Sequence, residues 1–145
     1  MNTRVYDTLK HAQFIARRLK RFNPDIAANL VLMELALPVN SDGYDYVRRA
    51  IVAKYHHPAQ LYMGEIYACV GERYTSYVSP SSMEFTIRSN IKRAWQRRDA
   101  EVWEYYFPAD VYGGKKPSNT VFISEIARFL ALVELYCKEV SSNEA

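Results

Sequence analysis

The sequence contains few cysteines and histidines, and none is placed to bind a metal. Its two cysteines, Cys69 and Cys137, lie far apart and have no cysteine or histidine at a ligand spacing. Isolated thiols predict a reduced, cytoplasmic protein in which both cysteines are buried or half-buried. The adjacent His56 and His57 would point about 100° apart on a helix, and His11 stands alone. We therefore expect no metal site and no cofactor.

Long hydrophobic runs are also absent. No apolar stretch approaches the roughly 18 residues of a membrane span, and the N-terminus lacks the apolar core and cleavage site of a signal peptide. The sequence offers no nucleophile beside a plausible base, so an enzyme is the weakest functional hypothesis. Gly113 to Lys116 have neither the spacing nor the preceding strand of a phosphate-binding loop. We expect a cytoplasmic protein that acts by binding and does not contact a membrane.

Glycine and proline are scarce and scattered, with five and six copies, and alternating strand patterns are rare. Hydrophobic residues make up 49% of the 145 residues and charged residues 24%, as in an ordinary globular domain. We predict an all-helical bundle with an N-terminal amphipathic helix at 1–22, a main domain at 23–140 and a frayed tail at 141–145. The expected helices lie at about 3–22, 24–37, 44–55, 59–74, 80–98, 99–107 and 119–138, with a loop at 108–117.

Acidic residues are rare in two segments of a chain whose net charge is only +3. Asp7 is the single acid of the first segment, and the second has none after Glu84. The cations are Arg4, Lys10, Arg17, Arg18, Lys20 and Arg21 in the first segment, and Arg88, Lys92, Arg93, Arg97 and Arg98 in the second. Two such clusters favour a polyanionic partner. Two solvated helix faces would give the same pattern.

The first segment predicts an amphipathic helix that packs on the rest of the chain. Its apolar face comprises Val5, Leu9, Ala12, Ile15 or Ala16, and Leu19. Three interpretations stay open: a structural brace, an arm that contacts phosphates, and a dimerisation helix.

The segment from Ser79 to Arg98 predicts the helix around which the domain is organised. Ser79 can accept a hydrogen bond from the first turn, and Pro80 suits the first helical position. Apolar residues recur at helical spacing and form one stripe: Met83, Ile87, Ile91, Ala94 and Trp95. The opposite face is polar and cationic, which suits a polyanion. Together with the preceding helix at 59–74 and the turn at 75–79, it would form a helix-turn-helix.

Four blocks of the sequence follow the order and spacing of one known family. Leu35–Pro38 and Gly43–Ile51 match Leu-Gly-Ile/Val-Pro and Gly-Tyr-x-Tyr-Leu-Arg-Glu-Ala-Ile. Ser79–Arg88 matches Thr-Pro/Ala-Ser-Arg-Val-Glu-Arg-Ala-Ile-Arg, Ala94–Arg98 matches Ala-Trp-Ser-Arg-Gly, and Lys116–Ile123 matches Lys-Pro-Thr-Asn-Ser-Glu-Phe-Ile. In these blocks the chain resembles the C-terminal effector domain of the stage 0 sporulation protein A response-regulator family.

The resemblance implies an all-helical DNA-binding domain of a bacterial transcription regulator that acts in sporulation. The helix at about 66–74 would cross the DNA backbone, and the helix from Pro80 would enter the major groove. Family members bind tandem boxes, often as a head-to-tail pair, and contact the sigma subunit of RNA polymerase, here through residues 96–112. They also carry a phosphorylated receiver domain. The residues before Asp25 are too few for its doubly wound sheet, so we expect no receiver and no phosphorylation control within this chain.

The expected DNA interface combines base-facing and phosphate-binding side chains, because phosphate contacts position a protein and base contacts choose its site. The base-facing residues are Ser81, Ser82, Phe85 and Ser89, flanked by Glu84 and Arg88. The phosphate-binding residues are Lys92, Arg93, Lys115, Lys116 and Ser118. Asn119 is also expected to belong to the DNA interface.

Two departures from the family bear on function. Ser82 and Phe85 replace arginines that read bases in the family, where one arginine–guanine fork contributes roughly 1–3 kcal/mol of discrimination. The turn at 75–79 is also longer than the family's. The chain therefore reads a different sequence, binds DNA less specifically, or keeps the fold without the role. The alternative function is a protein-interaction module or antagonist that docks a partner through Phe85 and the aromatic run Trp103, Tyr105, Tyr106 and Phe107.

Overall fold

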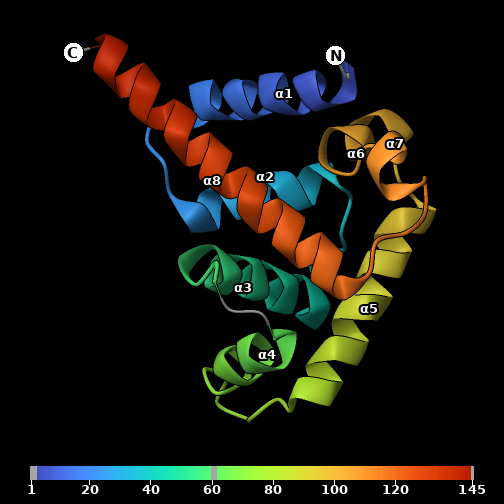
Figure 1. Cartoon of the computed structure of the whole chain (residues 1–145). Coiled ribbons are helices and arrows are strands. Elements are labelled where there is room, and N and C mark those ends of the chain that lie inside the picture. Colours follow the sequence, from blue (N-terminus) through green and yellow to red (C-terminus); the bar gives the residue numbers. More distant parts are fainter. Residues whose placement is uncertain (1–2, 60–61, 145) are drawn as a thin grey trace.

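The computed structural model describes the backbone of residues 3–59 and 62–144 and the side chains of residues 7–59 and 62–142. Within these residues the chain forms eight helices and no strand, which confirms the all-helical prediction (Figure 1). The helices are α1 (Thr3–Leu19), α2 (Pro24–Glu34), α3 (Asp42–His56), α4 (Met63–Gly71), α5 (Pro80–Gln96), α6 (Ala100–Tyr106), α7 (Ala109–Tyr112) and α8 (Asn119–Glu144). In the described part of the chain, no helix combines the length and the hydropathy of a membrane span.

The last helix, α8, is the axis of the bundle. It packs against α1 on one side and α3 on the other, and its N-terminal end meets α5 (Figure 1). Its inward side chains are completely buried; they are Phe122, Ile123, Ile126, Leu130 and Val133. Because α8 contacts α1, α2, α3, α5 and α6, it fixes the positions of helices that are distant in sequence.

Most helix starts carry the caps that their sequences predict. The Asn23 side chain accepts a hydrogen bond from the Ile26 N–H at 3.1 Å, with Pro24 next in the chain. The Ser118 hydroxyl accepts from the Val121 N–H at 3.2 Å, which makes Ser118 the residue that caps α8. Such caps satisfy donors that have no partner within the helix.

The N-terminal helix is part of the core. Ala12, Ile15 and Ala16 are buried, as the amphipathic pattern predicts, while Val5 lies outside the described side chains. A polar cluster also joins α1 to α2 and α6. The His11 imidazole lies 2.7 Å from Glu34 Oε1, and the Tyr106 hydroxyl donates to the same oxygen at 2.8 Å.

Several element boundaries differ from the prediction. The turn at 108–117 contains the short helix α7, because the Glu104 carboxylate accepts the Ala109 N–H at 3.2 Å and Gly113 ends the helix at φ 73°. The C-terminal helix α8 continues to Glu144. It therefore passes the expected end at 138 and enters the segment expected to fray. Its C-terminal half stays helical because it packs on α1, where Cys137 contacts Ala16.

The two cysteines have different environments, which corrects half of the prediction. Cys137 is buried, as expected, and burial raises the pKa of its thiol. Cys69, expected to be buried or half-buried, is exposed. It lies on α4 between residues that face the core, Ile66, Tyr67 and Val70, and points away from them.

Candidate nucleic-acid interface

The local sequence at the start of α5 fixes which of its faces is buried. The Ser79 hydroxyl accepts the Ser82 N–H at 3.2 Å, and Pro80 occupies the first turn. From this start Met83, Ile87, Ile91 and Ala94 point into the core and are completely buried, as the apolar stripe predicts. The side chains of the outer face are therefore presented to solvent: Ser81, Ser82, Glu84, Phe85, Arg88, Ser89, Lys92 and Arg93.

Phe85 stands out on this face because 66% of its surface is exposed. A phenylalanine with that exposure contributes little to the core and is available to a ligand. Lys92 and Arg93 are also exposed, about two turns further along the helix. Neither has an ion-pair partner among the described residues, so their charges are open to an anion.

Arg88 is held by Glu84 one turn earlier. Its guanidinium lies 2.6 Å from Glu84 Oε1, and the two side chains are 55% and 48% exposed. A solvent-exposed pair of this kind stabilises a helix by only about 0.3–0.5 kcal/mol. Arg88 can therefore exchange Glu84 for a phosphate or a base edge at low cost in stability.

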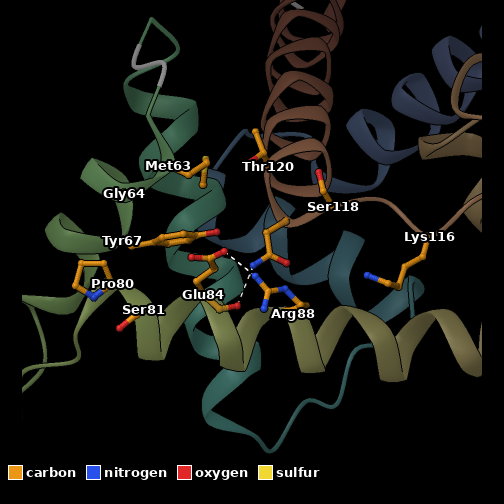
Figure 2. Close-up of a pocket in the computed structure, with 11 residues that line it drawn as sticks. Met63, Gly64, Tyr67, Pro80, Ser81, Glu84, Arg88, Lys116, Ser118 and Thr120 are labelled. Carbon is orange, nitrogen blue, oxygen red and sulfur yellow. Dashed lines mark hydrogen bonds and ion pairs between the residues drawn. The ribbon is translucent and has the colours of Figure 1, made fainter.

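A groove of about 540 Å³ opens beside Arg88 (Figure 2). It lies where the N-terminal ends of α4, α5 and α8 come together. Its lining comprises Met63, Gly64, Tyr67, Pro80, Ser81, Glu84, Arg88, Lys116, Ser118, Asn119 and Thr120. The Lys116 side chain extends into the groove toward Arg88 (Figure 2). Free N–H groups at helix starts and two cations make this groove attractive to an anion.

Asn119 has a different environment from the other expected contact residues. It is only 9% exposed, and its amide donates to the Glu84 backbone oxygen at 2.9 Å. It also forms a hydrogen bond with the Tyr67 hydroxyl; burial raises the pKa of Tyr67, and this bond opposes the rise. The Asn119 side chain thus ties α4, α5 and α8 together at the floor of the groove.

The structure places one of the two loop lysines, Lys116, beside α5. Lys116 is half-buried in the groove wall, and Lys115 is exposed in the loop before α8. Met63, Gly64 and Tyr67 also line the groove and were not among the expected site residues. The sequence does not predict that these three residues line a groove, because helical periodicity only assigns Tyr67 to the inward face of its helix.

The segment between α4 and α5, residues 72–79, is anchored to α3. The Tyr74 hydroxyl donates to Asp45, and the Arg49 guanidinium lies over the Tyr74 ring at 5.1 Å. Burial would raise the pKa of Asp45, but hydrogen bonds from Tyr74 and Arg48 and the charge of Arg49 outweigh it, so that pKa lies below its usual value. A charged Asp45 therefore holds this connection, and with it the entry angle of α5.

The aromatic run after α5 belongs mainly to the core. Trp103, Tyr106 and Phe107 are buried, and Tyr105 is half-buried with its ring stacked 4.2 Å from His11. Val111 is the large apolar side chain of this region that is exposed. The run therefore offers a partner protein much less aromatic surface than its composition suggests.

A comparison with protein families identifies the chain. The model of the family described as "Sporulation initiation factor Spo0A C terminal" matches residues 28–130, more than half of the sequence. This chain belongs to the Spo0A C-terminal family. The family is the DNA-binding effector domain of a sporulation response regulator, so the resemblance of the four sequence blocks is confirmed.

The matched range clarifies which parts of the molecule the family explains. It extends from within α2 to within α8 and so contains the exposed face of α5 and the groove beside it. The helix α1 and the C-terminal part of α8 lie outside the match and pack against each other. The Spo0A-like region is thus joined to a helix pair that the family does not account for.

Proposed function

We propose that this chain is a sequence-specific DNA-binding regulator that inserts α5 into the major groove. The observation that carries the proposal is the outer face of α5, where Phe85, Lys92 and Arg93 are all exposed beside a cationic groove. An α-helix fits the major groove, where base edges carry the most sequence information. In this arrangement α4, residues 72–79 and α5 act as a helix-turn-helix, with α4 across the backbone.

Each part of the surface has a proposed role. Ser81, Ser82 and Ser89 face base edges, and Phe85 lies against a thymine methyl group, an apolar contact that such edges provide. Glu84 and Arg88 flank them. The phosphate contacts come from Lys92, Arg93, Lys115, Lys116 and Ser118. Asn119 acts as a positioning residue, because its buried amide is already bonded to α4 and α5.

Ser82 and Phe85 stand where other family members have base-reading arginines, and this lowers the DNA sequence specificity that we expect. Serine and phenylalanine provide fewer directional contacts than arginine, so we propose a weaker and different preference from that of the arginine-bearing family members. Polymerase contact through residues 96–112 and self-association on tandem sites remain predictions. The exposed residues of this segment are Gln96, Arg97, Arg98, Asp99, Ala100, Glu101, Asp110 and Val111.

The test compares two double variants on a duplex selected from a random pool. We expect R88A/K92A to lower affinity and to flatten the plot of log K against log salt by about one to two units, since each lost phosphate contact removes nearly one unit. The measurement is fluorescence anisotropy at several salt concentrations. R128A/K138A removes the same charge from exposed positions of α8 and should leave the slope unchanged.

Two results would contradict the proposal. An unchanged salt slope for R88A/K92A would show that α5 does not face the phosphates. If the unmodified chain binds a protein partner but no duplex, the protein-interaction module is favoured instead. Phe85→Ala should then weaken the complex with that partner.

A further inference from the structure

The outer surface of α1 is basic and has no role in the proposed interface. Arg17, Arg18, Lys20 and Arg21, which we call the α1 basic face, are all exposed. None of the four has an ion-pair partner among the residues that the structure describes. Acids are also rare nearby in sequence, because Asp7 is the single one in α1. The face is therefore a cluster of uncompensated positive charge.

The local structure holds these cations at the end of the helix. The Arg18 guanidinium lies 5.9 Å from the centre of the Phe14 ring, which supports its planar group and leaves its N–H donors free. Lys20 takes up a left-handed conformation with φ 62° and ends α1, so the chain turns and Arg21 follows. Arginine is the side chain best suited to paired hydrogen bonds with phosphate oxygens.

The α1 basic face lies far from the proposed major-groove surface. Asn119, at the start of α8, touches α5, whereas the Cys137 thiol donates to the Ala16 carbonyl oxygen of α1 at 3.7 Å. These two contacts are about 27 Å apart along α8 at 1.5 Å per residue. Figure 1 shows α1 on one side of α8, with α3 and α4 on the other. Because α5 lies at the N-terminal end of α8 and the α1 basic face near its C-terminal part, a straight duplex docked on α5 would lie at the other end of the bundle from that face (Figure 1).

We propose that the α1 basic face binds the phosphate backbone of a second DNA duplex, so that one chain can bridge two duplex segments. This inference rests on the proposed function, in which α5 holds the first duplex. It requires no base reading, because cations alone provide sequence-independent affinity for DNA. The bridge would hold two DNA segments near opposite ends of α8.

Other polyanions fit this face less well. A membrane-surface helix inserts its apolar side into the lipid, but that side of α1, with Ala12, Ile15 and Ala16, is buried in the protein core. A protein interface needs an apolar centre with anchoring side chains. Beside these cations Phe14, 48% exposed, is the one large apolar side chain of α1 described as exposed.

The experiment measures capture of a second duplex. A biotinylated duplex of about two helical turns is immobilised, loaded with the full chain and exposed to a fluorescent duplex. We expect R17Q/R18Q to lower the amount of captured duplex about tenfold, because two phosphate contacts are lost, and to leave affinity for a single selected duplex nearly unchanged. The matched control R128Q/K138Q should capture as the unmodified chain does, and circular dichroism should show equal folding of all three proteins.

The number of chains in each complex distinguishes a bridge by one chain from a bridge by a dimer. Sedimentation velocity should find one chain per two duplexes, whereas two chains would mean that a dimer forms the bridge and would overturn the inference. Binding of one duplex without capture of a second, or capture that R17Q/R18Q does not change, would overturn it while the proposed function stands. Failure to bind any duplex would reject both. R17Q/R18Q-sensitive binding to phosphatidylserine vesicles without duplex capture would assign the face to membranes instead.

Discussion

At the scale of single residues, the backbone of Ala36 is unusual. It has φ 65° at the end of α2, a left-handed conformation that favours glycine. The resembling sequence block of the Spo0A family has glycine at this position. The conformation is fixed by the turn, in which the Ala36 N–H donates to Met33 and the Leu37 N–H to Leu32. Alanine therefore occupies a turn conformation in which glycine would be unstrained.

Replacing Ala36 with glycine should stabilise the protein. Release of the left-handed strain is worth about 1–2 kcal/mol, and the extra freedom of glycine in the unfolded chain costs about 0.4–1 kcal/mol. We expect a net increase of about 0.5–1 kcal/mol in the free energy of unfolding, measured by urea titration at constant m-value. Ala131→Gly on the exposed side of α8 is the control and should destabilise by about 1 kcal/mol. A less stable A36G protein would contradict the assigned conformation.

At the scale of helices, the contact between α3 and α5 depends on one missing side chain. A Cβ atom at Gly43 would lie 2.1 Å from the Asn90 amide nitrogen, far inside contact distance. Asn90 is buried, and its amide donates at 3.2 Å to the hydroxyl of Ser41, the residue that caps α3. Because α3 also anchors residues 72–79 through Asp45, this contact helps to set the orientation of the proposed recognition helix.

A double-mutant cycle should reveal this coupling. Gly43→Ala should lower the free energy of unfolding by about 1–3 kcal/mol through overpacking, and Asn90→Ala should lower it by about 1–3 kcal/mol through the lost hydrogen bond. In the double variant the smaller alanine at 90 makes room, so we expect a loss smaller than the sum by at least about 1 kcal/mol. Gly64→Ala, which meets nothing within 4 Å, is the control. Additive losses in urea titrations would argue against a shared contact.

At the scale of the whole molecule, α1 and the family-matched region share one core. Ile15 on α1 is almost completely buried, and α8 provides the opposing surface. The proposal that follows is that the N-terminal helix is a brace that folds together with the rest, even where its outer face also binds DNA. The predicted boundary at residue 22 would then separate segments of sequence and not units of folding.

Ile15→Ala tests this proposal through a distant reporter. We expect the free energy of unfolding to fall by about 2–5 kcal/mol, as for other buried isoleucines, with one transition in both circular dichroism and tryptophan fluorescence. Both tryptophans, Trp95 and Trp103, lie on α5 and α6, so their fluorescence reports on the matched region. Leu135→Ala on the exposed side of α8 should have a small effect. If Ile15→Ala does not shift the midpoint of the unfolding transition measured by tryptophan fluorescence, α1 unfolds separately from the matched region.

The sequence by itself determined all the described helices except the short α7, most of their caps and the direction of the α5 face. Those features depend on residues within one or two turns, such as Ser79 with Ser82 or Met83 with Ile87, so local spacing contains the information. Only the tertiary structure decided that Asn119 is buried under Glu84 and that Asn90 fills the space over Gly43. The bonds involved join residues 35 and 49 positions apart, and no periodic pattern encodes which helix ends will meet. The groove and the separation of the two basic faces arise in the same way, because they exist only once α8 has brought distant helices together.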